Sequence, residues 1–190
     1  MHWRSAAALA MLAVGTPVLA APACRAMAYL TFDTGSQSQA QLIADTLKRH
    51  HIQATFFLAN EKTVRGDYSL DPSWSAYWNA RVAEGHAFGS HTFDHDVLVK
   101  DGGTGNNGNN AGIRVKPGFG AGAGKVRSVT PAQYCEEIKR VDQRFVELTG
   151  KHLDPIWRAP AGRTGPDHHP PAPRRRRGAR CLVGHHGGGT

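Results

Sequence analysis

Apolar and polar positions between residues 29 and 162 alternate between the spacing of strands and the spacing of helices. Two short β-prone runs, at 29–32 and 52–58, flank a segment at 38–50 in which apolar residues recur every three or four positions. The order strand, helix, strand predicts a βαβ unit, and such units build parallel sheets with helices on their faces. We therefore expect an α/β fold.

Two further helices and two further strands follow. Residues 72–84 should form a helix that begins at a proline and stops before a glycine, and 87–90 should form the next strand. The sequence TPAQ at 130–133 is typical of a capping box, so another helix should begin there and end at Gly150. Residues 155–157 are expected to form a last short strand. The helix after the capping box carries one apolar stripe: Tyr134, Ile138, Val141, Phe145 and Leu148.

Two segments lack this patterning. Residues 102–124 are rich in Gly and Asn and hold almost no large apolar side chains, which predicts a mobile inserted loop. From residue 167 the chain changes to Pro, Arg, His and Gly without periodicity, which predicts a disordered basic tail over 167–190. Much of the formal charge of +8 lies in that tail, so the charge does not indicate a specific nucleic-acid-binding protein.

The amino terminus has the features of a secretory signal peptide. A basic start is followed by an apolar run at 6–14 and by small residues up to Ala20. The apolar run is shorter than the roughly 20 residues that a membrane-spanning helix needs. We therefore expect a signal peptide at 1–20, a folded domain at 27–166, no transmembrane segment, and a secreted or periplasmic protein. Three cysteines allow at most one internal disulfide.

Chemically versatile residues follow the predicted strands. Asp33 follows the first strand, and Arg158 follows the last. His91 and His95 are spaced so that one turn or tight loop can bring both imidazoles to a single metal ion. Two imidazoles suit zinc, with cobalt, nickel and manganese as alternatives. Taken singly, each of these residues has an ordinary alternative, as a turn residue, a helix cap or a surface charge.

Three short sequences occur in an order that resembles a known family. The sequences TFDTG at 31–35, HTFDH at 91–95 and RAPAG at 158–162 resemble the first three motifs of the polysaccharide deacetylases, the NodB-homology group of carbohydrate esterases. The resemblance implies a distorted (β/α) barrel with fewer than eight strands. It also implies metal-dependent hydrolysis of N- or O-acetyl groups on an acetylated cell-wall or extracellular polysaccharide, by a protein that we expect to be a monomer.

The same resemblance implies roles for individual residues. Asp33 would be the general base that takes a proton from the attacking water, and Arg158 would hold and orient Asp33. His91 and His95 would be the metal ligands. The residues implied to line the substrate groove are Pro160 and Ala161, the second with its backbone N–H at the oxyanion.

The first motif departs from the family pattern at one position. The family normally carries a second aspartate there, as a third metal ligand, where this chain has Thr34. Threonine is a neutral and poorer ligand, and a catalytic zinc usually has three protein ligands. Asp94 and Asp96, which lie close to His95 in the sequence, are candidates for the missing carboxylate. Solvated loop positions are the ordinary alternative for both.

The second departure lies beyond residue 162. Two further family motifs, which supply an aromatic groove wall and a histidine that protonates the leaving amine, are not found downstream. The abrupt change of composition near residue 167 leads us to expect a barrel that is incomplete, through truncation or a shift of reading frame. The alternative function is a catalytically impaired relative that binds glycan without turning it over.

Overall fold

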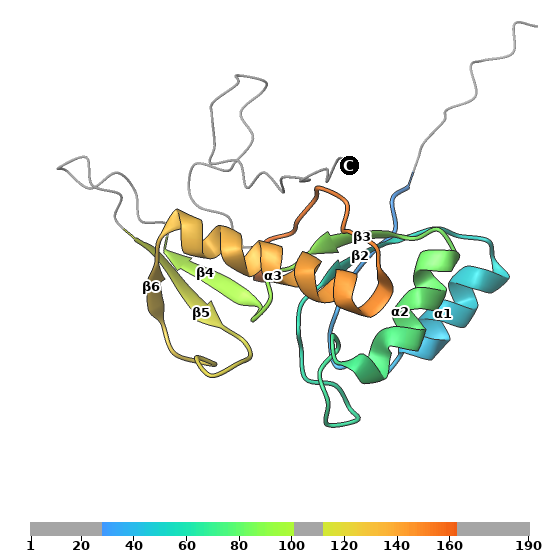
Figure 1. The fold of residues 1–190 in the computed structure, drawn as a ribbon, viewed down its shortest axis with the longest axis horizontal. Coiled ribbons are helices and arrows are strands. Elements are labelled where there is room, and N and C mark those ends of the chain that lie inside the picture. Colours follow the sequence, from blue (N-terminus) through green and yellow to red (C-terminus); the bar gives the residue numbers. More distant parts are fainter. Residues whose placement is uncertain (1–27, 101–111, 163–190) are drawn as a thin grey trace, which may run out of the picture.

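The computed structural model describes residues 28–100 and 112–162 (Figure 1). These residues form a parallel sheet, an antiparallel sheet and three α-helices. The parallel sheet has the order β1 (Thr31–Asp33), β2 (Thr55–Leu58), β3 (Ala87–Ser90). The antiparallel sheet has the order β4 (Asp96–Lys100), β5 (Ile113–Pro117), β6 (Arg127–Val129). The helices are α1 (Ala40–Arg49), α2 (Ser75–Ala83) and α3 (Pro131–Thr149), with short 3-10 helices η1 (Pro72–Trp74) and η2 (Pro160–Gly162).

The parallel sheet is built from crossover units. Helix α1 connects β1 to β2, and η1 and α2 connect β2 to β3, as parallel neighbours require. A parallel bridge between Ser90 and Trp157 adds a fourth segment beside β3. The strand expected at 155–157 is therefore a single bridge. The α/β class is confirmed, and the carboxyl ends of all four segments lie at one edge of the sheet.

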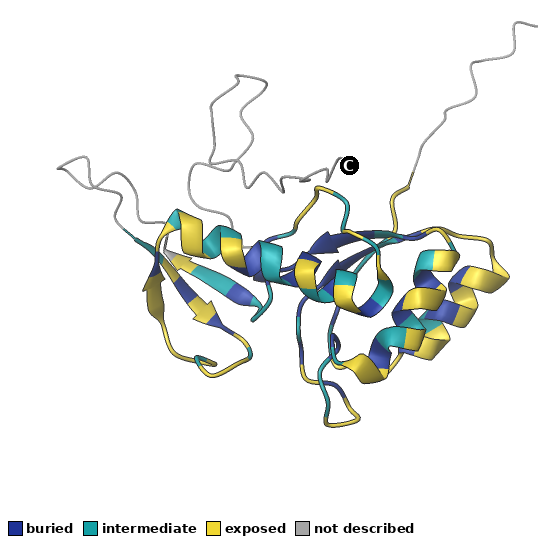
Figure 2. Cartoon of the chain, viewed as in Figure 1, coloured by how far each residue is buried: buried dark blue, intermediate teal, exposed yellow. Residues whose placement is uncertain are grey.

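Aromatic side chains fill the core between the parallel sheet and its helices, and Figure 2 shows β2 and β3 as largely buried. Phe56 stacks on Phe32 and Phe88 with ring centroids 5.5 and 5.9 Å apart. Trp78 from α2 meets Phe56 edge-on at 6.1 Å, and Phe145 from α3 lies 4.7 Å from Phe88. Full burial of a side chain of this size contributes about 1.5–3 kcal/mol. The aromatic core therefore fixes the sheet against α2 and α3.

Local sequence signals set the helix boundaries. The predicted capping box is present, because Thr130 Oγ1 accepts from the Gln133 backbone N–H at 3.1 Å and Gln133 Oε1 accepts from the Thr130 N–H at 2.8 Å. Helix α3 ends at Gly150, whose φ of 71° lies in the left-handed region that glycine tolerates. The helix predicted at 72–84 is divided into η1 and α2.

The loop predicted at 102–124 is wrong in part, because residues 113–117 form β5. This strand pairs with β4 and β6. Its apolar residues alternate, and Val115 and Pro117 are buried while Arg114 and Lys116 are exposed. The Gly and Asn content of the surrounding sequence masked this short period-two pattern.

Three other predictions lie outside the described residues: the signal peptide at 1–20, the tail at 167–190, and the part of the loop before residue 112. Cys135 on α3 is disulfide-bonded. Among the described residues, no helix combines the length and the apolar character needed to cross a membrane.

A hydrogen-bonded carboxylate orders the turn between β2 and α2. Asp67 accepts from Ser73 Oγ at 2.6 Å, from the Thr63 hydroxyl, and from Trp74 Nε1 at 3.1 Å. These bonds favour the ionised form, with that from Ser73 contributing most, and lower the pKa of Asp67 to about 2. Stability from this carboxylate is thus present above its ordinary pKa of 3.8 and is lost as the pH falls towards 2.

We predict that Asp67→Asn lowers the free energy of unfolding at pH 7, and that its difference from the wild type shrinks between pH 5 and pH 2. Urea unfolding followed by tryptophan fluorescence measures both. Asp45→Asn is the matched control, since Asp45 accepts only a side-chain amide bond from Gln41 on the exposed face of α1 among the described contacts. A difference for Asp67→Asn that stays constant over this pH range would contradict the assignment.

Candidate active site at the carboxyl edge of the parallel sheet

The four parallel segments deliver polar side chains to the same edge. Asp33 ends β1, and His91 directly follows β3. Arg158 directly follows the bridged residue Trp157. Glu61 lies three residues beyond the end of β2. Ligands of α/β folds bind at this edge, so the sheet itself selects the candidate site.

An ion pair joins the first and last of these segments. Arg158 Nη1 donates to Asp33 Oδ1 at 2.8 Å, and Nη2 donates to Thr31 Oγ1 at 2.6 Å. The guanidinium also lies over the ring of Phe57, 4.2 Å from its centroid. These contacts hold the Asp33 carboxylate in one orientation. The Asp33 side chain remains 38% exposed and is open to a small molecule.

The two histidines lie together, with ring centroids 4.9 Å apart. His91 Nδ1 is 2.9 Å from the backbone carbonyl of Arg158. A carbonyl only accepts, so this nitrogen carries the proton and leaves Nε2 with its lone pair. Burial lowers the pKa of His91, and burial followed by the proximity of His91 lowers the pKa of His95. Both rings are therefore neutral at pH 7, which is the form that binds metal.

Sequence reasoning missed a carboxylate at this edge. The Glu61 side chain is only 6% exposed, and its Oε1 lies 3.5 Å from His95 Nε2. Burial, with a smaller contribution from the charge of Asp33, raises the pKa of Glu61 to about 8. Glu61 belongs to no recognised motif. The available signal was its position just after a strand whose neighbours both end at site residues.

Thr34 has a structural role. Its Oγ1 accepts from the Ala59 backbone N–H at 2.8 Å and donates to the Ala59 carbonyl at 3.3 Å. The side chain is buried, and these bonds connect the turn after β1 to the segment after β2. The hydroxyl is thus already engaged with the backbone.

The aspartates near His95 in sequence point elsewhere. Asp94 Oδ2 lies 3.7 Å from Arg140 Nη1 on α3. Asp96 Oδ2 accepts from Arg127 Nη2 on β6 at 2.9 Å. These ion pairs turn both carboxylates towards α3 and β6, so the hypothesis that one of them replaces the carboxylate missing at position 34 finds no support in the structure.

Backbone strain gathers at the same edge. Of five non-glycine residues with positive φ in the described ranges, three are Thr92 (61°), His95 (53°) and Ala161 (57°). Such conformations cost about 1–3 kcal/mol each and persist where surrounding contacts impose them. Ala161 is exposed, whereas Pro160, predicted to line the groove with it, is fully buried.

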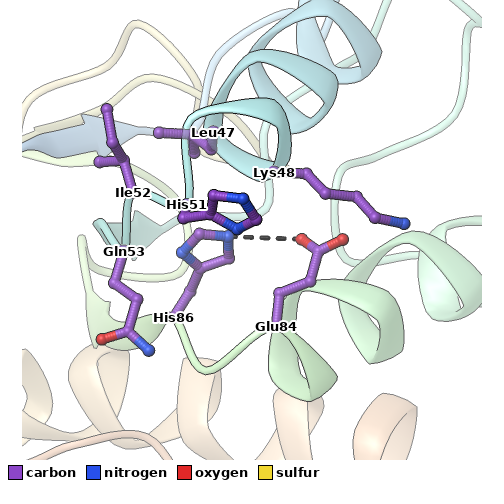
Figure 3. A pocket seen from close by; sticks show the side chains of 7 residues that line it. All are labelled: Leu47, Lys48, His51, Ile52, Gln53, Glu84 and His86. Atoms are coloured by element: carbon purple, nitrogen blue, oxygen red, sulfur yellow. Dashed lines mark ion pairs between the residues drawn. The ribbon is translucent and has the colours of Figure 1, made fainter.

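A separate hollow of about 370 Å³ lies at the amino ends of β2 and β3 (Figure 3). It contains a His86–Glu84 pair with Nε2 and Oε2 3.4 Å apart. Gln53 and His86 stand just before the strands, so this hollow lies at the edge opposite to Asp33 and His91. It adds nothing to the candidate site.

The donor set at the carboxyl edge suits a borderline divalent ion. Imidazole nitrogens with nearby carboxylate oxygens are typical zinc ligands. In the part of the chain that the structure describes, no group of three or more His, Cys, Asp and Glu side chains could hold a metal ion as the side chains stand. The suitability of this edge for a metal ion therefore rests on two pairs of neighbouring donor atoms. His91 Nε2 lies 3.7 Å from Asp33 Oδ2, and His95 Nε2 lies 3.5 Å from Glu61 Oε1.

Taken together, the parallel sheet and its polar edge define an α/β protein with a hydrolase-like cluster of carboxylates, imidazoles and a guanidinium. The sequence model of the polysaccharide deacetylase family matches residues 20–170. The chain belongs to this family of hydrolases.

Two curated relatives are peptidoglycan-N-acetylglucosamine deacetylases. The protein from Listeria monocytogenes is 38% identical over 72 residues, which are 37% of this chain and 14% of that protein. The protein from Bacillus cereus is 36% identical over 81 residues, or 42% of this chain and 26% of that protein. The matches thus span about a quarter or less of these relatives. The chitin deacetylase of Colletotrichum lindemuthianum superposes with a TM-score of 0.46 at 20% identity, over 70% of this chain and 45% of that one.

The role of Thr34 leads to a prediction about stability. Thr34→Val keeps the shape but leaves the Ala59 N–H and carbonyl without these bonds, so we expect a loss of about 1–3 kcal/mol. Thr34→Ser keeps the hydroxyl and should lose clearly less. Chemical denaturation of the two variants measures the difference, and equal losses would show that the hydroxyl bonds to Ala59 are unimportant.

Proposed function

We propose that this chain hydrolyses acetyl groups of an acetylated cell-wall polysaccharide, with the N-acetylglucosamine of peptidoglycan as the leading substrate. The observation that carries the proposal is the oriented Arg158–Asp33 pair, with Asp33 3.7 Å from the free nitrogen of His91, in a member of the polysaccharide deacetylase family. The peptidoglycan specificity in the names of the two curated relatives supports the substrate.

Each residue of the site has its own proposed role in the hydrolysis. His91 and His95 would hold a divalent ion, zinc first and cobalt, nickel or manganese as alternatives; when bound, it supplies Lewis acidity to the acetyl carbonyl and to water. Asp33 takes the proton from the attacking water. Arg158 is fixed by the bond from Nη2 to Thr31, and its bond from Nη1 keeps the Asp33 carboxylate turned towards the site.

Other groups orient the histidine and the substrate. The backbone carbonyl of Arg158 fixes the ring of His91 through Nδ1, so one residue positions both the base and a ligand. The exposed Ala161 offers its backbone N–H to the developing oxyanion, with the buried Pro160 packed behind it. The alternative of a binding protein without turnover rests on Thr34 and on the absence of the downstream histidine motif. The bonds of Thr34 to Ala59 give that residue a structural role under either function.

The wider architecture and location follow from the same proposal. The parallel sheet corresponds to part of a distorted (β/α) barrel of the deacetylase type. A substrate in the cell wall requires export, which the features of residues 1–20 also predict.

Acetate release tests the function. The purified protein, supplied with zinc, is incubated with N-acetylated peptidoglycan fragments, acetylated chito-oligosaccharides and acetylated xylan. We expect acetate from the first. Acetate release from xylan alone would mean that the substrate is an acetylated xylan and not peptidoglycan. If the folded protein releases acetate from none of the three substrates, the proposed activity is refuted.

We predict that Asp33→Asn lowers kcat by a factor on the order of 10² to 10⁴, because the amide cannot accept the proton while it can still accept the bond from Arg158. Initial rates of acetate release measure this effect. Asp45→Asn, the same chemical change on the exposed face of α1, is the control and should keep the wild-type rate. A kcat for Asp33→Asn within a few-fold of wild type would remove Asp33 from the role of base.

A further inference from the structure

Glu61 is held firmly although it lies in a loop. Its backbone N–H donates to Ser69 Oγ at 3.1 Å, and its carbonyl accepts from the Ser69 N–H at 2.8 Å. Ser69 Oγ in turn donates to the Ala59 carbonyl at 2.5 Å. Both Glu61 and Ser69 are buried. The loop after β2 is thus a fixed support for one carboxylate at the carboxyl edge of the sheet.

The carboxylate reaches the turn in which the first motif departs from the family pattern. A Cβ built on Gly35 would lie 3.7 Å from Glu61 Oε2. Gly35 directly follows Thr34, whose own hydroxyl is engaged with Ala59. The carboxylate of Glu61 therefore lies beside Gly35, the residue next to the position at which the family carries its second aspartate.

The distances around Glu61 suit shared coordination better than direct hydrogen bonding. The His95 Nε2–Glu61 Oε1 separation of 3.5 Å exceeds the usual hydrogen-bond range of about 2.7–3.2 Å. Ligand atoms about 2.0–2.2 Å from one tetrahedral zinc ion lie about 3.3 Å apart. The separation between His95 and Glu61 is close to that spacing.

Charge supports the same conclusion. Two carboxylates, Asp33 and Glu61, approach this edge, and Arg158 is directed at Asp33. Among the described residues, the basic side chain beside Glu61 is that of His95, and its imidazole is neutral. A buried carboxyl group needs a cationic partner to be stable in its ionised form, and a divalent cation would be such a partner.

We propose that Glu61 is a carboxylate ligand of the divalent ion held by His91 and His95, and that it replaces the aspartate absent at position 34. This inference rests on the proposed metal-dependent function. It assigns the third protein ligand to the loop after β2, so this chain reaches the usual ligand number of a catalytic zinc site by another route.

Zinc binding to the purified full chain tests the inference without reference to activity. Competition with a chromophoric chelator gives the zinc Kd of the wild type, Glu61→Gln and Glu61→Asp. Removing a group that merely supports a ligand costs 10- to 100-fold in metal affinity, so Glu61→Gln should weaken zinc binding at least about tenfold. Glu61→Asp keeps the charge on a shorter side chain and should lie between the two.

Thermal unfolding separates a ligand from a structural residue. Exchanging the buried Glu61 carboxyl group for an amide should leave the metal-free protein about equally stable, while the gain from added zinc should shrink by about 1.4 kcal/mol for each tenfold loss of affinity. Glu136→Gln is the matched control, because Glu136 is exposed on α3 and pairs with Lys139. It should match the wild type in both measurements.

His95→Ala distinguishes the possible failures. If His95→Ala loses zinc binding while both Glu61 variants keep the wild-type Kd, Glu61 is not a ligand and the proposed function stands. If the wild type binds zinc no better than His95→Ala, the metal site itself is wrong, and this inference is overturned with the metal-dependent part of the proposed function.

Discussion

The parallel pairing of β1, β2 and β3, extended by the bridge from Ser90 to Trp157, is the constraint on which the site depends. Each segment carries its polar group at or just beyond its carboxyl end, so the ladder alone brings Asp33, His91 and Arg158 together. The stacked rings of Phe32, Phe56 and Phe88 lie across the three strands and hold the register from within the core. A slip of one residue would turn these side chains to the opposite faces and separate the site residues.

Burial then determines the protonation states at this edge. It lowers the pKa values of His91 and His95, which keeps both rings neutral at pH 7, and it raises the pKa of Glu61 to about 8. Arg158 compensates the charge of Asp33 through a single hydrogen bond from Nη1, while its Nη2 donates to Thr31.

Local signals in the sequence were sufficient for much of the fold. The capping box at 130–133, Gly150 and the aromatic strand of β2 are recognisable from a few adjacent residues, and each is found in the structure. Glu61 could not be predicted in this way, because its role depends on contacts with His95, which lies on another element. Asp94 and Asp96 illustrate the reverse case. They neighbour His95 in sequence, but their partners are arginines of α3 and β6.

The antiparallel sheet, which was not predicted from the sequence, supports His95. Gly118, just after β5, donates its N–H to the Asp94 carbonyl at 2.9 Å, and a Cβ there would be only 3.2 Å from His95 Nδ1. The ring of Phe119 meets His95 edge-on at 6.2 Å.

From the other side, the Phe93 N–H donates to the Glu137 carbonyl on α3 at 3.0 Å, and the Phe93 carbonyl accepts from the Asn60 N–H at 2.8 Å. The strained turn at Thr92 and His95 is therefore held between α3, the segment after β2 and the segment after β5. Because Asn60 directly precedes Glu61, the bond that fixes the histidine turn also fixes the backbone beside this carboxylate. The positions of His95 and Glu61 are thus set by one set of contacts, to which each sheet contributes a part.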